Sequence, residues 1–179
     1  MSIQRSQAGV SRRTMITGAA WAVPAIAVVS NAPAFAASPI VEPELIPGTL
    51  CKYPGGSAGN DLKHAYRFRA NFTNKSTHTV NVEPLPGASS ITFDGDAGRV
   101  GRLRFFESDP LTGGELGSFT LEGGETKPFY LVLDNYGNSQ DASGTITIAF
   151  KVTDNVTGES MTQVFTVRFP KGIIGCDKL

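Results

Sequence analysis

The feature that most constrains this chain is a two-residue alternation of apolar and polar side chains, which returns several times after residue 62. The clearest case is the segment 145–152, TITIAFKV, in which the apolar side chains stand at every second position. Successive side chains of a β-strand point to opposite faces of a sheet, so this period is typical of a strand with one buried face. The segment therefore predicts a strand that buries Ile146, Ile148, Phe150 and Val152.

The same period appears in six further segments. Their apolar positions are Tyr66, Phe68, Ala70 and Phe72; Val80 and Val82; Ile91 and Phe93; Leu103 and Phe105; Phe129, Leu131 and Leu133; and Phe165, Val167 and Phe169. Turn-forming residues separate the segments, and helical spacing with caps is missing after residue 37. Seven or eight short strands in about 140 residues describe an antiparallel β-sandwich. We therefore expect an all-β domain over residues 63–179.

Residues 1–36 differ from the rest of the chain and are typical of a secretory signal peptide. Arg12 and Arg13 precede an uncharged, largely apolar run, which ends in the small-residue pattern Ala34-Phe35-Ala36. The run is about 15 residues long, shorter than the roughly 20 that a membrane-spanning helix needs. We expect cleavage between Ala36 and Ala37. A buried N-terminal helix is the alternative, but the segment has no amphipathic period.

The adjacent arginines indicate the export route. Ser11–Ile16 (SRRTMI) resembles the twin-arginine motif, in which two arginines precede a variable residue and two apolar ones. The alternative is that Arg12 and Arg13 are the positive end of a general-secretion signal. Gly18–Ala27 also resembles leaders of secreted proteins from Gram-positive bacteria. The resemblance implies a bacterial export substrate that meets the twin-arginine machinery and then signal peptidase.

The two cysteines, Cys51 and Cys176, lie near the two ends of the chain that remains after cleavage. An even, minimal count in an exported protein predicts one disulfide bond, with two free thiols as the alternative. Two cysteines without nearby histidines or acidic pairs are too few for a metal site. Cys51 falls within residues 37–62, which we interpret as a Pro/Gly-rich, extended lead-in before the sandwich.

Charge argues against one large class of partner. The leader holds three of the 16 basic residues and no acidic one, so the remainder has 13 basic against 16 acidic residues, a net charge of −3. Nucleic-acid binding would require a strongly basic domain, so we expect no such partner. A second apolar run long enough to span a membrane is absent. We therefore expect no transmembrane anchor in the mature form.

The strand pattern resembles the immunoglobulin-like modules of bacterial surface proteins. Leu121–Leu133 (LEGGETKPFYLVL) is similar to a turn of such modules that runs L-x-x-G-E before an apolar strand. The cysteine–tryptophan–cysteine core of antibody domains is missing, because the only tryptophan, Trp21, lies in the leader. The resemblance implies an immunoglobulin-like sandwich and leaves the activity undetermined, since one fold serves many functions.

Residues that could carry out catalysis or bind a metal are few. The sequence has no G-x-S-x-G nucleophile motif, and we interpret His64 and His78 as exposed loop residues. Asp94 and Asp96 stand two apart in a glycine-containing turn, as at the start of a calcium loop, but the position of the bidentate glutamate is Phe105. A plain turn is therefore the preferred interpretation. We expect no catalytic residue, no metal and no cofactor.

Four arginines define a candidate contact face. Arg67 and Arg69 alternate with buried positions on one expected strand, and Arg102 and Arg104 do so on another. If the two strands share a sheet, the side chains form a basic surface that could meet an anionic cell-wall polymer. The alternative is that they are solvated strand positions interleaved with acids.

Together these features favour an exported, non-catalytic binding or structural module that works on the cell envelope or outside the cell. Its expected partner is a cell-wall polymer or another surface protein. Loops on a stiff scaffold can vary without unfolding it, so binding residues are expected in Gly55–Asp61 and Asp94–Gly101. A calcium-dependent accessory domain or a cell-wall hydrolase is the alternative.

Overall fold

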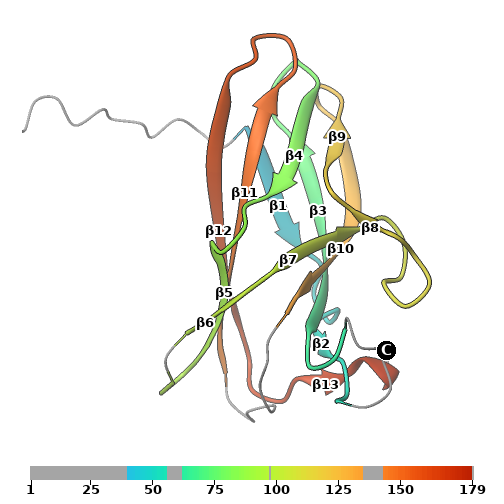
Figure 1. The fold of residues 1–179 in the computed structure, drawn as a ribbon, viewed down its shortest axis with the longest axis vertical. Coiled ribbons are helices and arrows are strands. Elements are labelled where there is room, and N and C mark those ends of the chain that lie inside the picture. Colours follow the sequence, from blue (N-terminus) through green and yellow to red (C-terminus); the bar gives the residue numbers. More distant parts are fainter. Residues whose placement is uncertain (1–39, 56–61, 97, 135–142, 179) are drawn as a thin grey trace, which may run out of the picture. The chain divides into compact units, whose positions relative to one another are not determined.

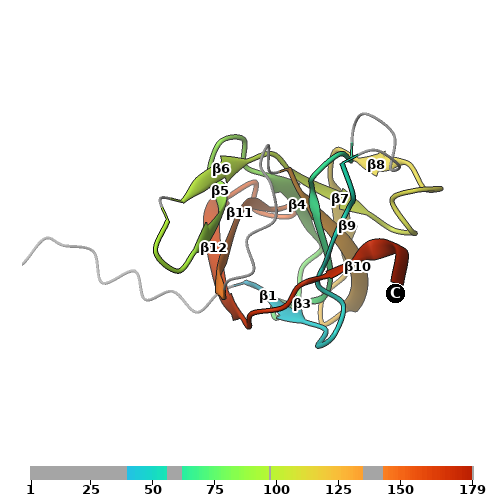
Figure 2. The ribbon, with the colours of Figure 1, turned by 90° about the horizontal axis from the view of Figure 1, so that it is seen from below.

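The computed structural model describes residues 40–55, 62–96, 98–134 and 143–178. Within the compact unit Pro39–Leu179 they form two β-sheets and one short 3-10 helix, η1 (Cys176–Lys178). The expected all-β, immunoglobulin-like sandwich is confirmed (Figures 1 and 2). The expected signal peptide, with Arg12, Arg13, Ala36 and Ala37, lies outside the described residues.

Thirteen described strands make up the two sheets. Sheet A contains β1 (Val41–Leu45), β2 (Cys51–Lys52), β3 (Tyr66–Asn74), β7 (Leu103–Phe106), β8 (Glu115–Leu116), β10 (Thr126–Leu133) and β13 (Ile174–Gly175). Its strands follow the order β13-β2-β3-β10-β7-β8, and β1 also pairs with β3. Sheet B contains β4 (Val80–Pro84), β5 (Ser89–Phe93), β6 (Arg99–Gly101), β9 (Phe119–Leu121), β11 (Gly144–Asp154) and β12 (Ser160–Phe169). Its strands follow the order β6-β5-β11-β4-β9, and β12 also pairs with β11. The pairs are antiparallel except β2 with β13. The expectation of seven or eight strands missed β2, β6, β8 and β13, which have only two or three residues and therefore show no period, and it also missed β1.

The main core lies between the sheets and consists of the alternating residues that the sequence indicates. Phe72 of β3 stands at its centre, with its ring centroid 5.3 to 5.9 Å from those of Phe105, Phe119, Phe129 and Phe150, in edge-to-face geometry. Such aromatic pairs add to the free energy gained from burying their area. The inward positions predicted for the strands up to Val152 are all buried.

Strands β1 and β2 pair with the same edge of β3, one after the other, and the break between them falls at Ile46-Pro47-Gly48-Thr49. Sheet B repeats this arrangement: β4 and β5 pair with the same edge of β11, and their break contains Leu85-Pro86-Gly87. Gly48 has φ 75° and Gly87 has φ 71°, a conformation that favours glycine. Each break therefore acts as a local bulge in an otherwise continuous edge.

The interpretation of residues 37–62 as a lead-in that precedes the sandwich is corrected by the pairing of β1 and β2 with β3. The segment is extended, as expected, but its extended backbone is a strand of sheet A. Pro43 is tolerated there because β1 is an edge strand, where a missing N–H donor need not break a ladder bond.

The predicted disulfide bond between Cys51 and Cys176 is confirmed, and the two residues are 125 positions apart. It joins β2 to the start of η1, beside the parallel pair of β2 and β13. Both cysteines are buried, and they pack in a second, smaller apolar cluster with Tyr53, Leu62, Ala65, Phe106 and Val132. The bridge therefore holds the last described segment against the outer side of sheet A.

Candidate functional site

The four arginines of the expected contact face do gather on sheet A. Arg67 and Arg69 lie on β3, Arg104 lies on β7, and Arg102 directly precedes β7. Strand β10 runs between β3 and β7. On β3 the arginines alternate with core residues such as Phe68, so their side chains belong to the face of the sheet that points away from the main core.

That face is covered by the smaller apolar cluster. Arg67 is only 7% exposed and Arg104 only 4%. The guanidinium carbon of Arg67 lies 5.6 Å from the ring centroid of Tyr130 and 5.9 Å from that of Tyr53. The guanidinium carbon of Arg69 also lies over the ring of Tyr130, 4.9 Å from its centroid. Cation–π contacts of this kind stabilise cations that have lost water.

Carboxylates neutralise most of the arginine charge. Arg67 forms an ion pair with Asp109 at 3.1 Å, and Arg104 forms one with Asp134 at 2.7 Å. Burial raises the pKa of Asp134, and the neighbouring Arg104 acts in the opposite direction. A buried charge without a partner is costly. The ion pairs with Asp109 and Asp134 therefore make the burial of Arg67 and Arg104 possible.

The expectation of an exposed basic face is therefore wrong for Arg67 and Arg104. Arg102 is exposed but is paired with Glu115, and Arg69 is half-buried against Tyr130. Alternation along a strand identifies the face of the sheet and gives no information on what covers that face. Arg67, Arg69 and Arg104 therefore contribute to the packing of sheet A, and the four arginines do not form an exposed basic face.

A further buried cation lies where β2 meets β3. Lys52 Nζ stands 4.9 Å from the ring centroid of Tyr66, its cross-strand neighbour. Burial first, and then the nearby Arg99, lower the pKa of Lys52 to about 8. Burial also raises the pKa of Tyr66 to about 12. Both groups thus favour their uncharged forms more than they would in water.

The acidic and histidine candidates have structural partners. Asp94 accepts hydrogen bonds from Ser143 Oγ at 2.6 Å and from Arg168 at 2.7 Å. The last residues of the expected loop Asp94–Gly101 form β6, so this loop ends in a strand. Residues 56–61 of the other expected loop lie outside the described part. In the described residues, no group of three or more His, Cys, Asp or Glu side chains could hold a metal ion.

The two histidines do not share a site. His78 lies in the bend after β3 with its side chain 42% exposed, as expected of a loop residue, and its Nδ1 atom lies 2.8 Å from Asp154 Oδ2. Backbone N–H groups of Thr157 and Val156 donate to the other oxygen of Asp154. The Thr157 bond first, and then the His78 contact, lower the pKa of Asp154. His64 has φ 62°, and its ring lies beside Gly55.

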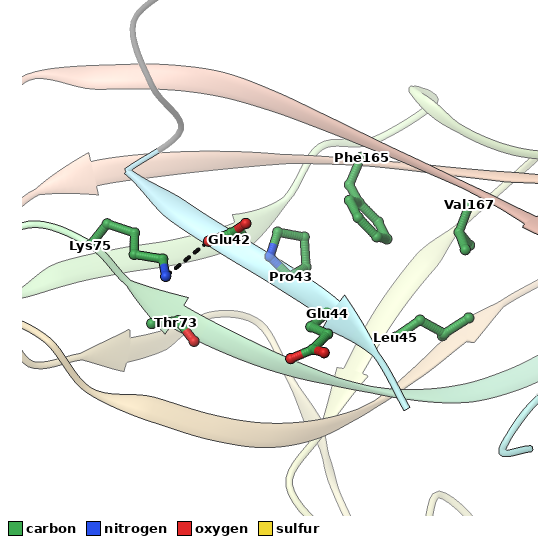
Figure 3. Close-up of a pocket in the computed structure, with 8 residues that line it drawn as sticks. All are labelled: Glu42, Pro43, Glu44, Leu45, Thr73, Lys75, Phe165 and Val167. Carbon is green, nitrogen blue, oxygen red and sulfur yellow. Dashed lines mark ion pairs between the residues drawn. The ribbon is translucent and has the colours of Figure 1, made fainter. Parts of the chain in front are cut away.

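A hollow of the described surface lies along the seam where β1 of sheet A faces β12 of sheet B (Figure 3). It has a volume of about 550 Å³. We call it the seam groove and define it by its lining residues, which are Glu42, Pro43, Glu44, Leu45, Thr73, Lys75, Phe165 and Val167. One hydrogen bond crosses the seam, from Val41 N to Gln163 Oε1 at 3.1 Å.

The seam groove combines an apolar lining with a charged rim. Pro43, Leu45, Phe165 and Val167 provide the apolar side chains. On the rim, Lys75 Nζ pairs with Glu42 Oε2 at 2.9 Å, and the exposed Glu44 adds a second carboxylate (Figure 3). The rim therefore carries a small net negative charge, which is the opposite of the basic face that the sequence suggested.

The sequence does contain a signal for β1. In VEPEL, residues 41–45, apolar side chains alternate with glutamates, and the structure buries Val41 and Pro43 and exposes the two glutamates. The prolines in residues 37–62 favour an irregular lead-in over a strand, and for this reason the alternation in VEPEL is easily overlooked. Phe165 and Val167 were predicted to point inward, and they do, but they are only half-buried because no strand pairs with β12 beyond β11 among the described residues.

The two paired sheets define the protein as an immunoglobulin-like antiparallel β-sandwich. No protein-family model matches the chain, and no curated protein matches it. Among solved structures it is similar to the ASH/PapD-like domain of human CEP192, at 14% identity and a TM-score of 0.38, covering 75% of this chain and 86% of that one.

Two further solved structures show the same degree of similarity. One is a FixG-related protein from Vibrio parahaemolyticus, at 14% identity and a TM-score of 0.35, and the other is the CooA pilin subunit from enterotoxigenic Escherichia coli, at 10% identity and 0.37. Each covers 75% of this chain and 99% of its own. Because these TM-scores are low, the assignment to the immunoglobulin-like β-sandwich class rests on the two sheets of this chain itself.

Proposed function

We propose that the chain is an exported, non-catalytic module of a bacterial cell envelope, which works by contact between its surface and another envelope protein. The observation that carries this proposal is the buried Cys51–Cys176 disulfide bond. Disulfides form and persist in oxidising compartments outside the cytoplasm. The leader with Arg12 and Arg13 provides a route to such a compartment.

The contact surface that we propose is the seam groove with the strands beside it. It offers apolar side chains next to the unpaired edge of β12, which suits an extended protein segment. An anionic wall polymer fits less well, because the rim is acidic and the arginines of sheet A are occupied by Asp109, Asp134 and Glu115. The carboxylates of Asp94, Asp109, Asp134 and Asp154 are each held by an ion pair or a hydrogen bond, which supports a module without a reaction of its own.

The export part is tested by producing the full chain in a bacterium that has both export routes. We expect the protein in the exported fraction, with Ala37 at its N-terminus by mass spectrometry. The double variant Arg12→Lys, Arg13→Lys keeps the charge and should remain in the cytoplasm if the twin-arginine route is used. Retention of the unaltered protein, with its leader intact, would contradict export.

The contact part is tested by sedimentation of the exported protein with cell envelopes. Thr73→Arg places a large side chain in the seam groove and should abolish co-sedimentation. Thr120→Arg is the matched control, because Thr120 is exposed on β9, which does not line the groove. Release of soluble wall fragments by the purified protein would show a hydrolase and overturn the non-catalytic proposal.

The described residues contain no helix long and apolar enough to cross a membrane. Digestion of the envelopes with protease before the assay should abolish co-sedimentation, because the proposed partner is a protein.

A further inference from the structure

The edges of the two sheets differ in how they are protected against pairing with another chain. Strands β8 and β13 have two residues each, and β6 and β9 have three. Strand β1 has five residues but carries Pro43 and two glutamates. Short length, proline and charge are the usual means by which proteins prevent edge-to-edge association.

Strand β12 lacks these protections. It is ten residues long (SMTQVFTVRF) and contains no proline, no glycine and a single charged residue, Arg168, close to one end. It pairs with β11 over the whole length from Ser160 to Phe169, and its other edge has no strand partner among the described residues. Val164, at the middle of its solvent-facing row, is 63% exposed.

The hydrogen bond that crosses the seam, from Val41 N to Gln163 Oε1, does not occupy the backbone groups on the outer edge of β12. Gln163 accepts from Val41 N through its side chain, which points inward from β12. Among the described residues no strand pairs with the outer edge of β12, so its backbone groups there can bond to solvent or to another strand. A long unprotected edge of this kind is a template for a further antiparallel strand.

We propose that β12 pairs antiparallel with β12 of a second copy, around a two-fold axis at Val164, so that sheet B continues across both molecules. This inference rests on the proposed contact surface, and the envelope protein that it names as the partner is a second copy of this chain. Residues opposite each other in an antiparallel pair share a face, so the register follows from the exposed row. In this register Val164 faces Val164, Thr162 faces Thr166, and Ser160 faces Arg168.

Two features favour this register. Val164 is the only apolar residue among the solvent-facing positions, so only this alignment gives the row an apolar pair. The two copies of Arg168 lie at opposite ends of the paired strands, and each is already held by Asp94 at 2.7 Å. By contrast, β1 could not pair with itself in this way, because its glutamates would lie close to those of the second copy and Pro43 lacks an N–H.

The pairing also covers the half-buried side of β12. On the inward row the same register places Phe165 opposite Gln163 and Val167 opposite Met161 of the second copy. Phe165 and Val167 line the seam groove and are only partly buried in the single chain. A second copy would remove part of their apolar surface from water, which favours association.

The first test measures self-association of the exported protein by analytical ultracentrifugation over a range of concentrations. We expect a reversible dimer. Val164→Asp places two like charges directly opposite each other and should weaken the dimer by about tenfold or more. Val156→Asp is the matched control, because Val156 is 69% exposed in the turn between β11 and β12 and lies outside the paired strand.

The second test fixes the register. Residues opposite each other in an antiparallel pair have Cα atoms about 4.5–5.5 Å apart, which lies within the range that a disulfide bond spans, so Val164→Cys should form a covalent dimer on mild oxidation. Thr162→Cys is the control on the same face, since residue 162 faces Thr166 and not itself. Both native cysteines are already bonded and do not compete.

A protein that stays monomeric up to millimolar concentration would overturn this inference, and so would a dimer that Val164→Asp leaves intact in a correctly folded variant. Equal cross-linking of the two cysteine variants would overturn the register. These outcomes are separable from the proposed function. An exported monomer contradicts the dimer alone, whereas a dimer that remains in the cytoplasm contradicts export alone.

Discussion

Thr49 and Ser89 have the same hydrogen-bonding role in the two Pro-Gly breaks, one in each sheet, although Thr49 directly follows its glycine and Ser89 comes one residue later. Thr49 Oγ1 accepts a hydrogen bond from Arg69 N, and Ser89 Oγ accepts one from Ala149 N, both at 3.0 Å. The residue before each proline completes the arrangement, since Ile46 N donates to Arg69 O and Leu85 N to Ala149 O. A side-chain hydroxyl thus replaces the backbone acceptor that the bulge removes, and the strand beside it keeps its bonds.

Ser89→Ala is expected to lower the free energy of unfolding by about 1–3 kcal/mol, because it leaves the buried N–H of Ala149 without an acceptor. Ser90→Ala, at the next position of β5, is the control and should cost less than about 0.5 kcal/mol. Urea denaturation of the two variants provides the comparison. Equal losses would show that the Ser89 hydroxyl does not complete the ladder.

Removal of the disulfide bond should destabilise the fold. In the double variant Cys51→Ala, Cys176→Ala the unfolded chain is no longer closed into a loop, and the expected loss is about 2–5 kcal/mol. Denaturant midpoints of the oxidised protein and of the variant measure it. Thiol titration of the unreduced, denatured protein should find no free thiol, and two thiols per chain would contradict the bridge.

Phe150→Ala should cost about 3–5 kcal/mol, because Phe150 is fully buried and its ring packs 5.7 Å from that of Phe72. Thr147→Ala, on the other face of β11, should cost under about 1 kcal/mol. Its hydroxyl makes only a long contact of 3.4 Å with Thr166. Similar costs in thermal denaturation would mean that the faces of β11 are assigned the wrong way round.

Asp154 should make the fold sensitive to acid. Its pKa lies below the ordinary 3.8, chiefly through the backbone bond from Thr157 and then through His78. A carboxylate whose pKa is lower in the folded state stabilises the fold above the ordinary value, and this contribution is lost as the pH falls through the folded-state pKa.

Asp154→Asn is therefore expected to be less stable than the unaltered protein near neutral pH, with a difference that shrinks as the pH falls below 3.8. Denaturation series at several pH values measure this difference. Glu107→Gln, at an exposed position after β7, serves as the control. A difference between Asp154→Asn and the unaltered protein that stays constant over the whole range would contradict the assignment.

The main core could be predicted from the sequence because each long strand carries its own period. Ile146, Ile148 and Phe150 indicate their common face without any knowledge of their neighbours, and all three are buried. The burial of Arg67 could not be predicted in the same way. Its cover includes Tyr53 and Leu62, which come from segments without a period and reach sheet A through tertiary packing.

The sequence nevertheless contains a partial signal that the outer face of sheet A is covered by apolar side chains. Phe105 and Phe106 are consecutive, as are Leu131, Val132 and Leu133, and consecutive apolar residues in a strand indicate burial on both faces. The seam groove had no comparable signal, because it depends on the edge strands of two different sheets meeting along their length. Only the side-chain period of VEPEL indicated that one of those edges existed.

The position of the Cys51–Cys176 bond also decides how the fold would respond to mechanical load. Tension applied to the chain outside the two cysteines would pass from one sulfur to the other, so the strands between them would bear none of it. Strand β1 lies before Cys51 and outside this protected span. Pulling would therefore separate β1 from β3 and stop at the bridge, so that the seam beside β12 would give way while the rest of the sandwich stayed folded.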